Sequence, residues 1–69
     1  MSYNYSKLRG KIVEVFGTNE PFATAMGMSE RTLSLKLNSL RFWKQPEMER
    51  ACDLLGISRA EIPAYFFAH

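Results

Sequence analysis

The side chains that could carry out chemistry in this sequence are few, and their placement argues against catalysis. The single histidine, His69, is the last residue, and the single cysteine, Cys52, has no second thiol for a disulfide or a multi-cysteine zinc site. A nucleophile paired with a histidine base is therefore not expected. The sequence predicts a protein that is not an enzyme and that holds no metal and no cofactor.

Charge is distributed unevenly along the chain, although the net charge is only +2. Residues 31–44 carry basic side chains and no Asp or Glu, whereas residues 1–30 are balanced and residues 45–69 are acidic. The basic residues of this segment are Arg31, Lys36, Arg41 and Lys44. A basic segment inside an otherwise neutral domain favours nucleic acid as the partner.

The length of 69 residues, or 8.0 kDa, predicts one domain over residues 1–69, with a core from about 5 to 67. A chain of this size buries about 60% of its surface on folding, which allows one small core but no deep substrate pocket. No apolar run is long enough to span a membrane, which takes about 18 residues. We therefore expect a cytoplasmic protein in which Cys52 is reduced.

Apolar residues recur with a period near 3.6, which predicts an all-α fold of five short helices without a strand. Ser6 and Ser29 are expected to cap the first and third helices. We expect Val15 to face the core, and Phe42 and Trp43 to pack in or against it. The expected helices cover about 6–16, about 19–26, from Ser29 to about Asn38, from about Pro46 to Gly56, and a short last one that follows the capping box Ser58–Glu61 and contains Pro63.

The second and third expected helices are separated by only about three residues, which predicts a helix-turn-helix. Ala23 is small enough to let the third helix approach the second, and Gly27 can take the left-handed conformation of the turn. Leu33 is expected to wedge between the two helices. The third helix should then project from the body of the domain.

The stretch T-N-E-P-F-A-T-A-M-G-M-S-E-R-T-L-S-L-K-L-N resembles the lambda-repressor-like helix-turn-helix family. Together with Y-S-K-L-R-G-K-I and C-D-L-L-G-I, it is similar to small Cro-like regulators of phages and prophages. The resemblance implies that the third helix reads bases in the major groove through Glu30, Arg31, Thr32 and Leu35. Phosphate contacts are implied for Asn19, Ser29, Ser34, Lys36, Asn38, Arg41 and Lys44.

Two positions depart from the family pattern. Asn19 stands where the family often has Gln, and Ser39 stands where many relatives carry Gly. The first departure concerns a phosphate contact at the start of the second helix, and the second concerns the geometry of the loop after the third helix.

The function implied by the resemblance is sequence-specific binding of double-stranded DNA by a Cro-type repressor that acts by operator occupancy. Such regulators bind palindromic operators as homodimers, and the aromatic tail Tyr65, Phe66 and Phe67 is the expected dimer interface. The alternative, that the tail only seals the core of its own chain, stays open. The protein would be encoded by a phage or prophage and act in the bacterial cytoplasm.

An alternative from a different class is also open. The same fold can serve as a protein-interaction module, such as an antirepressor or an antitoxin-like partner. The basic segment favours DNA, whereas the aromatic tail allows a protein partner. A salt-dependent affinity for random duplex DNA would separate the two hypotheses.

Overall fold

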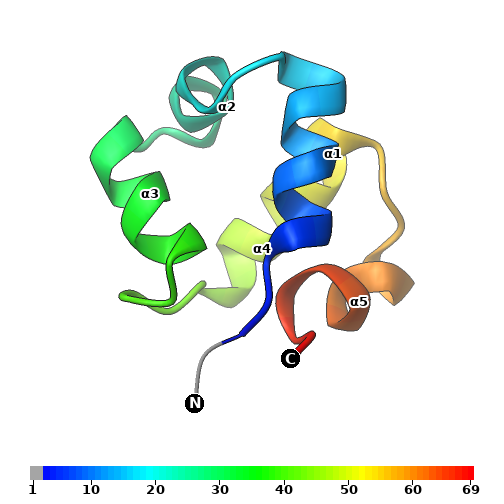
Figure 1. The fold of residues 1–69 in the computed structure, drawn as a ribbon. Coiled ribbons are helices and arrows are strands. Elements are labelled where there is room, and N and C mark those ends of the chain that lie inside the picture. The colour runs from blue at the N-terminus through cyan, green and yellow to red at the C-terminus, as the bar shows by residue number, and fades with distance from the viewer. Residues whose placement is uncertain (1–2) are drawn as a thin grey trace.

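The computed structural model describes residues 3–69 and consists of short helices around one core, without a strand in that range (Figure 1). This confirms the all-helical fold expected from the sequence. No helix among residues 3–69 is long and apolar enough to cross a membrane. The elements are α1 (Ser6–Phe16), α2 (Asn19–Met26), α3 (Glu30–Leu37), α4 (Gln45–Leu55), the 3₁₀ turn η1 (Arg59–Glu61) and α5 (Ile62–Phe66).

The first helix, α1, buries a narrow stripe in which Leu8 and Ile12 are fully enclosed. The Asn4 carboxamide oxygen accepts from the Ser6 amide at 2.9 Å, so Asn4 rather than Ser6 supplies the side-chain cap. The expectation that Val15 faces the core is wrong, because the stripe follows the i, i+4 positions and leaves Val15 46% exposed.

The turn between α2 and α3 has the geometry that the small residues predict. Gly27 has φ 78°, a left-handed conformation, and the Met28 amide donates to the Ala23 carbonyl at 3.0 Å. Ala23 and Leu33 are both buried, as expected for residues at the contact between the two helices. The Ser29 hydroxyl accepts from the Thr32 amide at 3.1 Å and caps α3.

The segment after α4, which holds η1 and α5, lies below α1 in the view of Figure 1. The Ser58 hydroxyl accepts from the Ala60 amide at 3.2 Å, and the Glu61 carboxylate accepts from the Ser58 amide at 3.1 Å. This capping box starts η1, and Pro63 then lies in the first turn of α5, where a missing N–H costs nothing.

Aromatic packing completes the core on the side where α5 meets the start of α4. Trp43 is buried and meets Phe66 edge to face, with ring centroids 5.0 Å apart. The prediction for Phe42 is wrong: its side chain is 85% exposed. Cys52 is a buried core residue, and its burial raises the pKa of the thiol.

Candidate functional site

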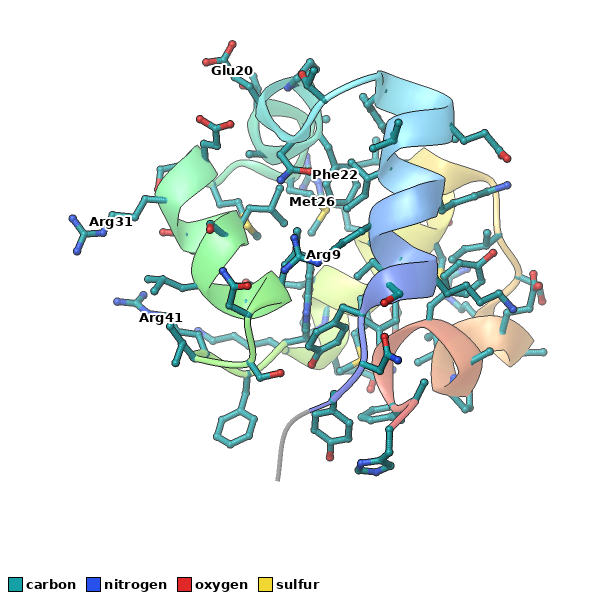
Figure 2. The ribbon with its side chains drawn as sticks, viewed as in Figure 1. Arg9, Glu20, Phe22, Met26, Arg31 and Arg41 are labelled. Atoms are coloured by element: carbon teal, nitrogen blue, oxygen red, sulfur yellow. The ribbon has the colours of Figure 1, made fainter. Side chains whose placement is uncertain are left out.

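The outer face of α3 presents the residues expected to read bases. Glu30 and Arg31 are exposed at its start, whereas Thr32 and Leu35 are half-buried. Figure 2 shows the Arg31 side chain pointing away from the domain, and Arg41, from the loop after α3, extends toward the same side. The structure therefore brings two guanidinium groups to one face.

Several side chains expected to contact phosphate form local hydrogen bonds that define the ends of α3. The Ser29 hydroxyl caps the helix and also donates to the Thr32 hydroxyl oxygen at 3.0 Å. At the other end the Asn38 side-chain amide Nδ2 donates to the Ser34 hydroxyl oxygen at 3.3 Å. Asn19 is half-buried at the start of α2.

Arg9 of α1 holds the C-terminal end of α3, a role that the sequence did not indicate. One guanidinium nitrogen, Nη2, donates to the Leu37 carbonyl at 2.9 Å and to the Asn38 side-chain oxygen at 2.8 Å. Figure 2 shows the side chain reaching from α1 toward α3. A cation at a helix C-terminus also interacts favourably with the helix dipole.

Lys36 requires a correction to the expected set of phosphate contacts, because its side chain lies inside the protein with only 4% of the residue exposed. Its ammonium donates to the Phe42 carbonyl at 2.9 Å and pairs with the Glu47 carboxylate at 2.9 Å. It also lies 5.8 Å from the centroid of the Trp43 ring. The charge that appeared free in the sequence is used within the fold.

Glu47 links this buried charge to the start of α4. Its carboxylate oxygen Oε1 accepts from the Lys44 amide at 2.9 Å and receives the Lys36 ammonium. Burial acts to raise the pKa of Glu47, but the two hydrogen bonds and the positive charges of Lys36 and Lys44 outweigh it and hold the pKa below its ordinary value. The pair joins the end of α3 to the start of α4.

The segment between these helices leaves α3 through a Schellman motif. The Ser39 amide donates to the Lys36 carbonyl at 3.2 Å, and the Leu40 amide donates to the Leu35 carbonyl at 2.8 Å. Ser39 has φ 63° and is the only residue other than glycine with positive φ among residues 3–69. Serine thus takes the left-handed position that glycine usually fills.

Two large apolar side chains project from this segment. Leu40 is 70% exposed and Phe42 is 85% exposed, and Arg41 stands between them. The sequence did not single them out, because an aromatic residue next to Trp43 reads as part of the core. The sequence feature that could have indicated their exposure is the number of apolar residues in this short connection between helices, which is more than a small core can enclose.

The aromatic tail packs largely against its own chain, and two of its three residues are not placed to form the expected dimer interface. Tyr65 and Phe66 are buried in the core of their own chain, so neither side chain is available at the surface for a second copy. Phe67 is 44% exposed and meets Tyr3 edge to face, with ring centroids 5.9 Å apart. The Asn4 amide also donates to the Ala68 carbonyl at 2.7 Å, so the tail seals the N-terminal segment.

The described part of the chain holds no pocket and no group of three side chains placed to bind a metal ion. The candidate site is instead a surface formed by the exposed residues of α3 and the loop that follows. Such a surface suits a macromolecular partner.

The fold and this surface define a small all-helical domain of the kind found in phage regulators. The chain belongs to the family described as a protein of unknown function (DUF739), whose model matches residues 1–69. It is similar to the modulator of repression (MOR) of the temperate bacteriophage TP901-1 from Lactococcus lactis, known from a solution structure. The two share 54% sequence identity over 97% of this chain and 90% of that chain, with a TM-score of 0.83. A comparison with curated proteins gives no match.

These findings correct the expected function. The prediction of a Cro-type repressor that occupies a palindromic operator as a homodimer is wrong, because the solved relative is a modulator of repression. Double-stranded DNA as the partner is wrong for the same reason. The alternative, a protein-interaction module of the antirepressor kind, agrees better with the relative.

Proposed function

We propose that this protein modulates repression in a phage or prophage by binding a repressor protein. The observation that carries the proposal is the 54% identity, over nearly the whole chain, to a protein described as a modulator of repression. At that identity, and with a TM-score of 0.83, the two chains share one fold, so a shared role follows more readily than a change of role.

The surface itself supports a protein partner. The Lys36 ammonium is buried and paired with Glu47, so the basic segment exposes fewer charges than the sequence suggested. Exposed Leu40 and Phe42 add apolar area, which protein interfaces bury at their centres. DNA, as a polyanion, takes its affinity mainly from charge. With Lys36 buried, three basic side chains of the segment remain exposed, and it is the two exposed apolar residues beside them that favour a protein partner.

The test uses the purified chain, the full-length repressor encoded by the same phage or prophage, and an operator duplex. We expect the chain to co-elute with the repressor in size-exclusion chromatography and to change the fraction of operator bound by the repressor in a gel shift. The chain alone should leave the operator unshifted. Absence of a complex, together with unchanged operator occupancy, would refute the proposal.

A further inference from the structure

We infer that residues Ser39–Phe42, together with Leu35, form the contact surface for the partner and dock into an apolar groove rimmed by carboxylates on the repressor. We name this surface, which includes the helical residue Leu35, the clamped loop. The inference rests on the proposed function and deepens it, since it names the surface and the chemistry of the partner. Three observations carry it: exposure, fixed backbone and charge.

Exposure at the clamped loop is concentrated in two apolar side chains. Phe42, at 85%, and Leu40, at 70%, are the most exposed of the large hydrophobic residues in the described chain. Leu35, half-buried in the last turn of α3, accepts a 2.8 Å hydrogen bond at its carbonyl from the Leu40 amide and is the third apolar residue assigned to this surface. Aromatic residues are enriched among the few side chains that contribute most of the energy of an interface.

The backbone under these side chains is held from three directions. The Lys36 ammonium binds the Phe42 carbonyl at 2.9 Å, the Leu40 amide binds the end of α3, and the Ser39 hydroxyl donates to the Tyr3 carbonyl at 3.3 Å. None of these bonds uses the Leu40 or Phe42 side chain. A loop that is ordered before binding loses less conformational entropy on association, so an apolar residue displayed on it is suited to recognition.

Charge identifies the kind of groove that fits. Arg31 and Arg41 extend to the same side of the domain in Figure 2, and neither forms an ion pair with residues 3–69. Residues 31–44 contain no acidic side chain, and Glu30, which precedes them, forms no ion pair with either arginine. A partner that buries Phe42 must therefore place carboxylates, rather than basic groups, around its apolar groove.

The experiment is isothermal titration calorimetry of the full-length repressor with wild type, Phe42→Ala, Arg41→Gln and two matched controls. Val13→Ala truncates a side chain that is 57% exposed on α1, and Arg59→Gln removes a charge from an exposed pair with Asp53. We expect Phe42→Ala to weaken binding at least 10-fold and Arg41→Gln about 3- to 10-fold at low salt. The control variants should bind within 2-fold of wild type.

The outcomes distinguish a failure of the assigned surface from a failure of the proposed function. Wild-type binding with Phe42→Ala within 2-fold of it would overturn the clamped loop as the contact surface and leave the proposed function intact. Absence of any binding by wild type would overturn both. Equal weakening by Phe42→Ala and Val13→Ala would show a general loss of fold and would also overturn the assignment; circular dichroism of each variant identifies that case. Affinity for random duplex DNA equal to that for the repressor would assign the surface to nucleic acid instead.

Discussion

Lys36 offers a direct test of how the loop after α3 is held, because one substitution removes the bonds and keeps the apolar stem. Lys36→Met deletes the ammonium that binds the Phe42 carbonyl and pairs with Glu47, both at 2.9 Å. Methionine has a similar length and no charge, so it fills the same space without overpacking. The substitution therefore isolates the polar contribution.

The magnitude follows from the burial of the two partners. A hydrogen bond to a charged group contributes about 1.5–3 kcal/mol, and removing one partner of a fully buried pair costs about 3–5 kcal/mol. The Glu47 side chain retains 24% exposure, so water recovers part of the loss for its carboxylate. We expect Lys36→Met to lower the free energy of unfolding by about 2 kcal/mol, a large share of the roughly 3–5 kcal/mol available to so small a core.

The assay is urea unfolding followed by Trp43 fluorescence and by circular dichroism, with Lys44→Met as the matched control. Lys44 is exposed and forms no salt bridge among residues 3–69. Its charge is the smallest of the influences that lower the pKa of Glu47, so its loss should change stability by less than about 0.5 kcal/mol. In a cycle with Glu47→Gln we expect a coupling of about 1 kcal/mol or more between the two positions. Additive effects, or a Lys36→Met loss no larger than the control's, would refute the role assigned to the buried ammonium.

Three further predictions concern the same region. Ser39→Gly should leave stability within about 0.5 kcal/mol of wild type in urea unfolding, because relief of the left-handed strain offsets both the lost 3.3 Å hydrogen bond to the Tyr3 carbonyl and the greater freedom of glycine in the unfolded chain. Ser39→Ala also loses that bond but keeps the strain, so it should be about 1 kcal/mol less stable than Ser39→Gly. Equal stabilities of the two variants would contradict this. Arg9→Ala should cost about 1 kcal/mol and speed amide exchange at the C-terminal end of α3, since it frees the Leu37 carbonyl; unchanged exchange there would argue against the tether. The pKa of Glu47 is lowered in the folded state, so its carboxylate contributes stability that is fully present above the unfolded pKa of about 4.3 and is lost as the pH falls through the folded pKa. Glu47→Gln should therefore make the free energy of unfolding less sensitive to acid below about pH 5. Parallel pH profiles of wild type and variant would contradict this role of Glu47.

Much of the fold could be predicted from residue spacing alone. Apolar periodicity, the capping box at Ser58 and the glycines at the ends of α2 and α4 are local signals, and the observed helices begin and end close to the expected positions. The turn between α2 and α3 was predictable because Ala23, Gly27 and Leu33 act through short-range sterics. These features need no knowledge of what packs against them.

The candidate site was less predictable, because it depends on contacts between distant segments. Lys36 looks like a surface charge until α4 brings Glu47 beside it. Phe42 and Trp43 are neighbours of similar chemistry, and only the path of the loop decides that one is buried and the other exposed. Arg9 is 28 residues away from the carbonyl that it binds. The function required the relative, since the same helices serve DNA-binding and protein-binding proteins.

The segment after α3 is held through backbone atoms, so its conformation does not depend on the side chains that it displays. The Lys36 ammonium donates to the backbone carbonyl oxygen of residue 42, and this oxygen is present whichever residue occupies that position. Positions 40 to 42 can therefore vary in sequence while the scaffold beneath them keeps its shape. With the clamped loop as the proposed contact surface, substitutions at these three positions would change the choice of partner without changing the fold.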